Sequence, residues 1–582
     1  MKEDNIQNIR HTLAHLLASA VGSIYKFDKV KLTLGPAIDN GFYYDIDFVD
    51  QKVTDKDLKK IEDTMKKNLP KWTAWEHKEL SKDEAISFFK NEYKVELINE
   101  IAERGEKITA YTCGGFTDLC RGGHTEHPAK DIDPESFMLD RVAGAYWRGD
   151  EKNKMLTRIY GLAFASKAEL DAYLLQRDEA IKRDHRKIGK ELNLFTIIDE
   201  IGLGLPLFYP KGAMLRRLVE NFISEEQMKR GYQDIWIPHI TKGELYKISG
   251  HLDKYDAMYS PMKVDENDYY LKPMNCPHFM MLYKSTPHSY RELPLRYTCT
   301  TTNYRYEKSG ELSGLTRVRA LTQDDCHIFC TKDQIRNEIE VILDMIKDVY
   351  AAFGLNDFYV RISLRDSKNK SKYLGEDAVW DTAENALREI VKKTGWRYEE
   401  AEDEAAFYGP KLDFMFKDAI GRQWQLSTIQ LDFNLPQRFE LEYTSNQSKQ
   451  ERPVVIHRAI LGSTERFLGV MIEHYAGNFP LWLAPVQVKI IPVRTNHNDY
   501  AKEIYTMLND AGIRAELDDA DSNLGGKVRD AKNNKLPYWI VIGDKEVAEN
   551  KVTLESRDAG NLGQMSKDEM LNKLLEEITN KK

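Results

Sequence analysis

The chain opens on an apolar stripe with the spacing of a helix. With His11 as origin and about 100° per residue, the apolar positions span about 140° to 280°, whereas His15 falls at about 40°. The apolar positions are Leu13, Leu16, Leu17, Ala20, Val21 and Ile24. Both histidines therefore face away from the core stripe, beside the small residues Ala18, Ser19 and Gly22. We predict a helix whose histidine face leaves room for a ligand to approach.

The middle of the chain, from Leu194 to Pro480, has the mixed pattern of an α+β domain. Residues 213–230 are predicted to form an amphipathic helix, because Leu215, Leu218, Val219, Phe222 and Ile223 recur at helical spacing. Gly231 then leads into an expected strand over 235–237, which ends at Pro238.

After Pro485, strands and helices alternate, which predicts a compact α/β module. The expected strands are Val488–Val493, Arg514–Asp518, Tyr538–Ile542 and Lys551–Glu555, and the expected helices are Tyr500–Ala511, Lys527–Asn533 and Lys567–Ile578. We find no internal repeat and no low-complexity segment.

A charged, helix-favouring run over 167–190 separates the N-terminal segment from the middle one. Its basic residues are Lys182, Arg183, His185, Arg186 and Lys187. This basic side is either an RNA contact or the solvated face of a linker, and the sequence leaves both open. We therefore expect an α+β multidomain protein with domains at 1–166, 191–482 and 483–582, and a linker helix at 167–190.

Composition describes an ordinary soluble protein, since 42% of the 582 residues are hydrophobic and 30% are charged. The six cysteines form no tight secreted-type framework, which favours a reducing, cytoplasmic compartment. No apolar run reaches the roughly 18 to 20 residues of a membrane span. The stretch Leu13–Tyr25 is interrupted by His15 and preceded by Glu3 and Asp4, unlike a signal peptide. The formal charge of −9 argues against non-specific nucleic-acid binding but allows a partner on one basic face.

Three zinc-type ligands lie scattered through the middle segment: Cys276, His327 and His457. A thiolate and two imidazoles suit zinc, and three protein ligands leave its fourth position open for a substrate. They are interleaved with two arginine motifs, Tyr304-Arg305-Tyr306-Glu307 and Gly462-Ser463-Thr464-Glu465-Arg466, which suggest a phosphate group. Cys326 and Cys330 are excluded as further ligands. Cys326 adjoins His327 on an expected strand and so points to the opposite face.

The order of these residues resembles that of class II aminoacyl-tRNA synthetases, and the full set resembles the threonyl-tRNA synthetase family, whose members bind zinc in the amino-acid pocket. The resemblance runs almost end to end. It includes Asn40-Gly41-Phe42-Tyr43-Tyr44, Cys120-Arg121-Gly122-Gly123-His124, Gly144-Ala145-Tyr146-Trp147-Arg148-Gly149-Asp150, Phe407-Tyr408-Gly409-Pro410-Lys411, Gln430-Leu431-Asp432-Phe433 and Leu483-Ala484-Pro485-Val486-Gln487. It implies an antiparallel-sheet class II catalytic domain between an N-terminal α+β editing domain and a C-terminal α/β anticodon-binding domain. It also implies that residues 213–238 form motif 1, the interface of a homodimer.

The resemblance implies ATP-dependent activation of L-threonine and its transfer to tRNA, with Mg²⁺ accompanying ATP and one Zn²⁺ per subunit held by Cys276, His327 and His457. The residues implied for ATP are Arg305, Glu307, Arg317, Arg319 and Arg466, with Arg305, Arg466 and Gln425 as the catalytic set. Those implied for threonine are Gln323, Asp325, Tyr408 and Gln430.

We consider the two histidines of the first helix together with a later motif, Cys120-x-x-x-His124, as one possible site. By spacing, these four residues could form a second zinc site. The resemblance favours a metal-independent editing pocket, in which His11, His15, Asp118, Cys120 and His124 hydrolyse mischarged seryl-tRNA. A purely structural role is the third possibility.

Several positions depart from the family pattern. Leu321 stands where many members have a Phe that stacks on adenine, and Thr301-Thr302-Asn303 replaces a stretch that usually contains His. In the C-terminal module, Glu546 is the candidate base contact. Glu555 and Asp521 replace a common Arg and Asn there, and we expect Lys527 or Arg557 to supply part of the lost contact. We also expect the ubiquitin-like domain that precedes the editing domain of most bacterial members to be absent.

Two rival interpretations remain to be compared with this one. A non-catalytic paralogue that binds RNA is expected to lack Arg305, Arg466 or a zinc ligand, and none is missing. A class II synthetase for serine or proline is disfavoured by the zinc ligands together with His11 and His124. The sequence therefore favours an active member of the threonyl family.

Overall fold

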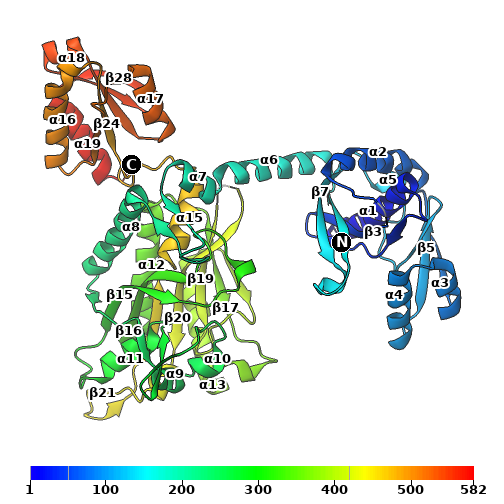
Figure 1. Ribbon diagram of the computed structural model, residues 1–582. Helices are drawn as coiled ribbons and strands as arrows, with labels where there is room; N and C mark the ends of the chain where they lie inside the picture. Colours follow the sequence, from blue (N-terminus) through cyan, green and yellow to red (C-terminus); the bar gives the residue numbers. More distant parts are fainter. Residues whose placement is uncertain (1, 50, 419, 582) are drawn as a thin grey trace. The chain divides into compact units, whose positions relative to one another are not determined.

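The computed structural model describes residues 2–49, 51–418 and 420–581. It divides into two compact units, Met1–Asp178 (unit 1) and Glu179–Lys582 (unit 2), which are described separately below. Figure 1 shows both units with their helices and strands labelled. Within the described ranges, no helix is long and apolar enough to cross a membrane.

Unit 1 is built on an antiparallel sheet that is covered by α1 (Lys2–Tyr25). The strands of this sheet are β1 (Val30–Leu32), β2 (Ala37–Ile38), β3 (Gly41–Phe48), β7 (Phe137–Tyr146) and β8 (Met155–Ala163), in the order β1-β3-β8-β7 with β2 on β3. Leu13, Leu16 and Leu17 are fully buried, as the helical periodicity predicts. α2 (Leu58–Asn68) packs beside α1.

A smaller sheet in unit 1 carries the second half of the predicted editing residues. Its strands are β4 (Glu76–Leu80), β5 (Ile108–Cys113) and β6 (Phe116–Leu119), and α3 (Lys82–Phe89) and α4 (Glu92–Glu103) pack with them. Asp118 lies on β6 and Cys120 follows it directly.

The linker is two helices, where the sequence predicts one. α6 (Lys167–Arg183) ends before Asp184, and α7 (His185–Glu191) begins after it. Asp184 has a non-helical backbone (ψ 119°), and its side chain accepts from the backbone N–H of Arg186. A side chain that caps a new helix in this way stops the preceding one.

The core of unit 2 is a largely antiparallel sheet with the strand order β11-β15-β16-β23-β20-β19-β17-β18. The bounds are β11 (Gln233–Asp234), β15 (Leu295–Tyr304), β16 (Ala320–Cys330), β17 (Phe358–Ser363), β18 (Tyr398–Ala401), β19 (Lys411–Lys417), β20 (Gln423–Asp432) and β23 (Val454–Ala459). The helices packed with it include α8 (Pro210–Lys229), α11 (Cys276–Lys284), α12 (Ile335–Ala352), α13 (Asp377–Thr394) and α15 (Thr464–His474). Cys326 and Cys330 point into the core that α12 and α15 cover, whereas Phe329 packs with α11 on the other face, as strand alternation predicts.

The strand expected after α8 is displaced toward the N-terminus. β11 covers only Gln233–Asp234, and the N–H of Ile235 makes one more bond, to Thr298 O. Trp236 is then 79% exposed. The predicted helix is therefore present, but the strand lies at 233–234, before the predicted residues, and 235–237 are outside it.

The C-terminal module matches the predicted alternation closely. Its sheet has the order β25-β24-β26-β27-β28, with β24 (Val488–Pro492), β25 (Ala515–Leu517), β26 (Tyr538–Ile542), β27 (Val552–Ser556) and β28 (Gly560–Met565). The longer helices are α16 (Asn498–Asp510), α17 (Leu524–Asn533) and α19 (Lys567–Thr579). β28 and the short α18 (Asp544–Glu549) were not expected. α18 buries none of its residues, and β28 contains two glycines. Neither element therefore shows the regular spacing of apolar residues from which a helix or a strand is predicted.

Candidate functional site

Cys276, His327 and His457 meet at the centre of unit 2. Cys276 begins α11, and the two histidines are direct neighbours across the pair β16 and β23. All three are buried, and their ligand atoms lie within 4.8 Å of one another. Three residues that lie far apart in the sequence therefore form one cluster, and its donor atoms are those predicted for zinc.

The nitrogens of this cluster fit a cation. Among the described residues, neither ring nitrogen of His327 has a hydrogen-bond partner, and Nδ1 of His457 has none either. Buried polar atoms are normally satisfied, so three orphaned nitrogens beside a thiol fit a site that binds a metal ion. Burial disfavours the charge of His457, but Cys276 and Asp432 outweigh it and raise its pKa to about 10. The groups around the cluster thus favour a positive charge beside Cys276 and Asp432.

A cavity of about 300 Å³ opens beside the cluster. Its lining includes Cys276 and His457 together with the predicted residues Arg305, Gln323, Asp325, Tyr408 and Gln430. Asn275 Nδ2 donates to Asp325 Oδ2 (2.8 Å), and Tyr408 OH donates to Gln430 Oε1 (2.5 Å). The structure therefore brings the predicted threonine-binding side chains together with the predicted metal ligands and one arginine.

The predicted phosphate-binding arginines also converge. Arg466, on α15, donates from Nε to Thr316 O (3.1 Å). Burial and the positive charges of Arg305 and Arg317 lower the pKa of Arg466. Three cations close enough to destabilise one another form a strong site for a polyanion.

Two predicted ATP contacts bind each other in this structure. Arg317 Nε donates to Glu307 Oε2 (2.9 Å), and Arg317 also pairs with Glu311 (3.0 Å). Arg319 donates to the backbone oxygen of Glu307 (3.0 Å). Both side chains lie on the expected hairpin, but Arg317 would have to leave Glu307 before it could bind a phosphate.

Gln425 lies next to the cavity, without lining it. Its Nε2 donates to Asp413 Oδ1 (2.6 Å), and the same oxygen accepts from Thr428, which does line the cavity. Leu321, one of the departures from the family pattern named above, is buried, with 8% of its surface exposed.

The unusual stretch Thr301-Thr302-Asn303 has a structural explanation. Thr301 Oγ1 accepts from Lys272 Nζ (2.8 Å), Thr302 bonds to Thr322, and Asn303 Nδ2 donates to Gln323 Oε1 (2.7 Å). The stretch therefore holds Gln323 at the cavity. Lys272 was not predicted: it is fully buried, and burial lowers its pKa to about 8.

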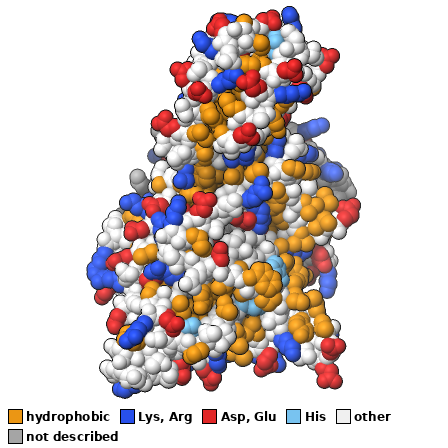
Figure 2. Space-filling model, turned by 90° about the vertical axis from the view of Figure 1, so that its left-hand side faces the viewer, with side chains coloured by type: hydrophobic (Ala, Val, Ile, Leu, Met, Phe, Trp, Pro, Cys, Tyr) orange, Lys and Arg blue, Asp and Glu red, His pale blue; other side chains and the backbone are white. Residues whose placement is uncertain are grey.

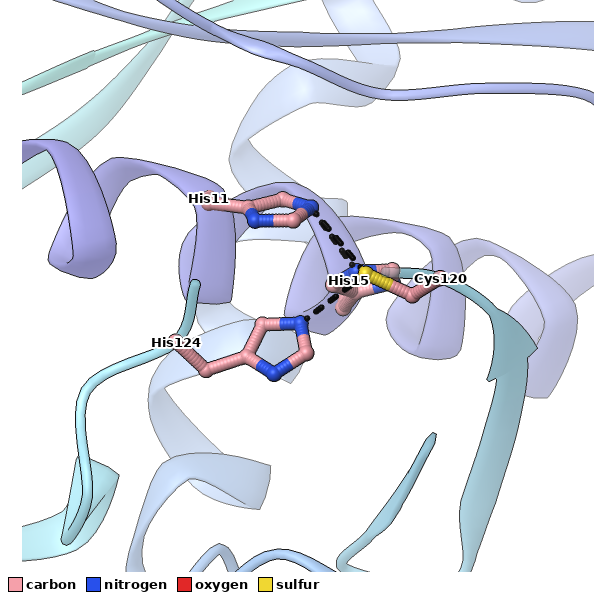
Figure 3. Close-up of side chains that lie close together, drawn as sticks. All are labelled: His11, His15, Cys120 and His124. Carbon is pink, nitrogen blue, oxygen red and sulfur yellow. Dashed lines mark hydrogen bonds between the residues drawn. The ribbon is translucent and has the colours of Figure 1, made fainter. Parts of the chain in front are cut away.

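A second cluster lies in unit 1, where His11, His15, Cys120 and His124 point toward one another (Figure 3). Cys120 Sγ lies 3.5 Å from His11 Nε2 and 3.3 Å from His124 Nε2. His15 Nε2 lies 3.2 Å from His11 Nε2. The four ligand atoms lie within 4.8 Å of one another, so the geometry also suits a metal ion.

Two acceptors, Asp118 and the backbone oxygen of Gly123, determine which nitrogens of His15 and His11 are protonated. His15 Nδ1 faces Asp118 Oδ2 (3.1 Å) and His11 Nδ1 faces Gly123 O (3.2 Å), so both Nδ1 atoms carry hydrogen. One further proton must lie between the two Nε2 atoms. The pair thus holds one positive charge, beside Cys120.

The pKa values agree with this proton count. Burial opposes the charge of His15, but hydrogen bonds to Asp118 and Cys120 outweigh it and raise its pKa to about 9. Burial opposes ionisation of Cys120, but hydrogen bonds from His11, His124 and His15 lower its pKa to about 3. Burial lowers the pKa of His124, so this ring is neutral at pH 7.

Sequence reasoning missed the residues that hold Asp118. Lys94 Nζ, on α4, lies 2.5 Å from Asp118 Oδ1, and Tyr44 OH donates to Asp118 Oδ2 (2.6 Å). Burial would raise the pKa of Asp118, but the charges of Lys94 and His15 reverse this and lower it. The available signal was a lysine on the apolar face of α4, in line with Ile98.

The small residues of the first helix do not all leave open space. A Cβ on Gly22 would lie 2.0 Å from the ring of Phe27. Ala18 is fully buried and Ser19 is 6% exposed. The room expected beside the histidines is therefore filled at these positions, and Trp75 stacks on His124 with ring centroids 3.9 Å apart.

The three residues predicted to contact the anticodon serve the fold of the C-terminal module. Glu546 accepts from Gly543 N (2.9 Å) and Thr553 Oγ1 (2.7 Å). Lys527 is 5% exposed, and its ammonium donates to Asp518 O (2.8 Å). Arg557 donates to Phe479 O and Lys535 O (both 3.0 Å). In this structure the polar groups of all three side chains are therefore paired within the module.

Comparison with known proteins adds the family context. Residues 257–475 match the tRNA synthetase class II core domain (G, H, P, S and T), and residues 487–577 match the anticodon binding domain. The chain is 48% identical to a threonine–tRNA ligase of Geobacillus sp. over 98% of its length and 88% of that protein. It is 45% identical to one of Aquifex aeolicus over 100% of its length and 90% of that protein.

Solved structures agree with these matches. The RNA binding domain of threonyl-tRNA synthetase from Cryptosporidium parvum aligns with a TM-score of 0.65 at 37% identity, covering 68% of this chain and 98% of that one. A putative threonyl-tRNA synthetase from Aeropyrum pernix aligns with a TM-score of 0.60 at 30% identity, covering 69% of this chain and 96% of that one.

Proposed function

Because the chain belongs to the threonine–tRNA ligases, which are class II aminoacyl-tRNA synthetases, we propose that its two clusters divide the work of the family. The cavity of unit 2 activates threonine with ATP and charges tRNA, and the histidine cluster of unit 1 removes serine that has been attached in error. The convergence of Cys276, His327 and His457 with Arg305 around one cavity carries the first assignment.

Activation joins the carboxylate of threonine to the α-phosphorus of ATP and releases pyrophosphate. The reaction needs no protein nucleophile, so the residues act by orienting the reactants and neutralising charge. Arg305 contacts the α-phosphate and the carboxylate, and Arg466 the γ-phosphate. Mg²⁺ enters with ATP, and Arg317 exchanges its carboxylate partner Glu307 for a phosphate, which leaves Glu307 free for the adenine amino group.

Cys276, His327 and His457 would hold one Zn²⁺, and Asp432 orients the last of these rings. When bound, zinc would act as a Lewis acid that binds the amino group and the hydroxyl of the substrate. Asp325, fixed by Asn275, accepts from the hydroxyl of threonine. Gln323 and Tyr408 help to hold the amino group, and Gln430 accepts from the Tyr408 hydroxyl.

This recognition explains why a second site is needed. A pocket built around a hydroxyl rejects valine by ~10⁴-fold or more, because valine leaves polar groups unpaired. Serine keeps the hydroxyl and lacks only a methyl group, which gives roughly 10- to 200-fold discrimination. Errors with serine must therefore be removed after the chemical step.

The charged pair of His11 and His15 beside Cys120 supports hydrolysis of the seryl ester in unit 1. His124 turns Nε2 toward Cys120, so its Nδ1 is the nitrogen that accepts a proton from water. The water oxygen bonds to the ester carbonyl carbon, the bond from that carbon to the ribose oxygen breaks, and the ribose oxygen takes a proton from the charged pair. Asp118, held by Lys94 and Tyr44, keeps the charge on His15.

A metal ion at the unit 1 cluster is the alternative, because its four donors also lie within reach of one ion. Zinc analysis of the wild type and of Cys276→Ala distinguishes the two. We expect one zinc per chain in the wild type and none in the variant, together with threonine-dependent pyrophosphate exchange in the wild type alone. Zinc retained by Cys276→Ala would favour a metal in unit 1, and exchange by a zinc-free wild type would refute the zinc site.

We further propose a cytoplasmic homodimer. The dimer is supported by exposed apolar side chains around the segment that resembles motif 1: Trp236, Ile240, Met281 and Leu282 are each more than a third exposed. Figure 2 shows hydrophobic side chains gathered on one face of unit 2. The anticodon-binding domain at 487–577 supplies the contact with tRNA.

A further inference from the structure

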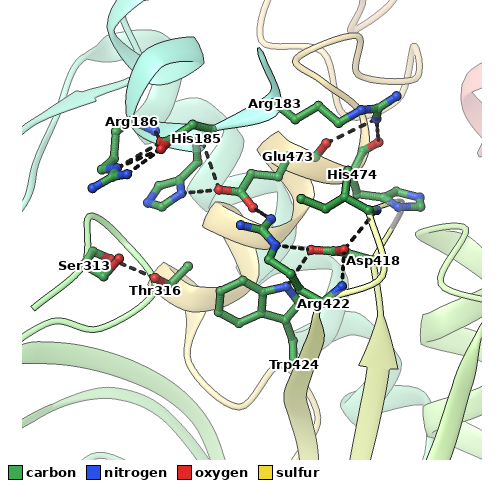
Figure 4. Close-up of polar contacts among 12 residues, drawn as sticks. Arg183, His185, Arg186, Ser313, Thr316, Asp418, Arg422, Trp424, Glu473 and His474 are labelled. Atoms are coloured by element: carbon green, nitrogen blue, oxygen red, sulfur yellow. Dashed lines mark hydrogen bonds and ion pairs between the residues drawn. The ribbon is translucent and has the colours of Figure 1, made fainter. Parts of the chain in front are cut away.

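His185 connects three separate segments of unit 2 (Figure 4). It is the first residue of α7 and is 3% exposed. Its Nδ1 lies 2.6 Å from Glu473 Oε1 on α15, and its backbone N–H donates to the same oxygen (3.1 Å). Its Nε2 faces the backbone N–H of Leu315 (3.0 Å), in the turn formed by residues 313–317.

These hydrogen bonds determine the tautomer of the His185 ring. A backbone N–H can only donate, so Nε2 of His185 is the acceptor and its proton lies on Nδ1, where it is donated to Glu473. Asp184, His185 and Glu473 lie close enough together to resemble a metal site. Because both ring nitrogens are already used, His185 is not a ligand there.

The 313–317 turn also packs directly on the ring. Gly314 has a φ of +47°, and a Cβ there would lie 2.1 Å from Nε2 of His185. Gly469, on α15, would bring a Cβ within 3.1 Å of Thr316 Cγ2 and 3.6 Å of His185 Cδ2. The absence of side chains at these two glycines lets the turn, the ring and α15 lie in contact.

The same turn is held from its other side by the ATP site. Thr316 O accepts from Arg466 Nε (3.1 Å), and the next residue is Arg317. Arg466 and Glu473 lie on the same helix. One helix therefore fixes the turn twice, directly through Arg466 and indirectly through Glu473 and His185.

The Glu473 carboxylate, which accepts from His185, is itself held in place by other side chains. Glu473 is 4% exposed and pairs with Arg422, which also donates to Asp418 Oδ2 (2.9 Å). Trp424 Nε1 donates to the same Asp418 oxygen (2.9 Å). Glu473 is therefore a rigid, charged support for the His185 ring.

We propose that His185 is a positioning residue for ATP: through Nε2 it holds the 313–317 turn so that Arg317 can reach the phosphates. The proposal rests on the proposed activation of threonine in unit 2. It predicts a defect confined to ATP, because Glu473 and Leu315, to which His185 is hydrogen-bonded, are not among the residues that line the threonine cavity.

Two substitutions distinguish the roles of the two ring nitrogens of His185. His185→Asn keeps an amide donor near the position of Nδ1 and removes the acceptor for Leu315. His185→Gln places an amide oxygen near the position of Nε2 and so keeps that acceptor. In pyrophosphate exchange we expect His185→Asn to raise the KM for ATP roughly tenfold, and His185→Gln to raise it less. The KM for threonine and the zinc content should not change in either.

A third substitution leaves His185 intact. Gly314→Ala should displace the turn from the ring and give the same ATP defect. Gly310→Ala is the matched control, because a Cβ at Gly310 meets nothing within 4 Å. This pair keeps the test decisive if the His185 variants fail to fold.

The outcomes also separate this proposal from the function on which it rests. If the wild type shows no threonine-dependent exchange, the proposed function fails. If the wild type is active and both His185→Asn and Gly314→Ala keep a normal KM for ATP, or raise the KM values for ATP and threonine equally, then the positioning role is refuted and His185 only stabilises the fold.

Discussion

Asp432 Oδ2 lies 2.9 Å from Nε2 of His457, and both side chains are buried. A carboxylate can only accept here, so the ring proton lies on Nε2 and Nδ1 is left for a metal. The carboxylate thus decides which nitrogen His457 offers to the cluster with Cys276 and His327.

We therefore expect Asp432→Asn to weaken zinc binding by about 10- to 100-fold, the usual effect of losing a partner that orients a metal-bound histidine. Zinc affinity is measured by competition with a chelator, and threonine activation should fall in parallel. Asp268→Asn, at an exposed residue of β14 (Asn267–Leu271), is the control. Unchanged zinc affinity in Asp432→Asn would show that the pair has no role in metal binding.

Arg305→Ala and Arg466→Ala should each reduce pyrophosphate exchange by about 100-fold or more, because each removes a charge aimed at the phosphates. Arg336→Ala, which removes a half-exposed arginine of α12, should leave exchange unchanged. Circular dichroism checks the fold of all three. Near wild-type turnover in either of the first two variants would contradict the assignment of the arginine site.

The double variant His11→Ala/His124→Ala should charge threonine almost normally and accumulate seryl-tRNA when serine is supplied. The reason is that unit 1 loses its charged pair and its base, while the cavity of unit 2 is untouched. The measurement is the rate at which preformed seryl-tRNA is deacylated. His127→Ala, an exposed neighbour outside the cluster, should retain the wild-type rate. A double variant as fast as wild type would refute the assignment.

Lys527→Met should destabilise the C-terminal module without changing recognition of tRNA. The buried ammonium bonds to Asp518 O, and its loss leaves that oxygen unpaired at a cost of about 1 to 3 kcal/mol. Denaturant unfolding measures the free energy, and aminoacylation measures the KM for tRNA. A raised KM for tRNA with unchanged stability would restore the original hypothesis of an anticodon contact.

Trp236→Glu should convert the proposed dimer into monomers, because a charge would replace a large apolar side chain that is 79% exposed. Light scattering after gel filtration gives the mass. Val547→Glu, at a 40% exposed apolar residue of the C-terminal module, should remain dimeric. If the wild type is monomeric at micromolar concentration, the proposed interface is wrong.

The sequence by itself determined the chemistry of the main cluster and the faces of the elements. Alternation along β16 separated His327 from Cys326, and helical periodicity put His11 and His15 outside the apolar stripe of α1. These properties are local, because the period of a strand or helix decides which way a side chain points. Alternation also indicated the C-terminal module, apart from the short α18 and β28.

Only the tertiary structure decided which of these side chains meet. Lys94 holds Asp118 through a contact between α4 and β6, and His185 binds Leu315 and Glu473, 130 and 288 residues away. Lys527 and Arg557 have the residue type of RNA contacts, but packing has turned their donors toward backbone oxygens. A sequence pattern gives the direction of a side chain relative to its own element. Its partner depends on how distant elements pack together, which no local period encodes.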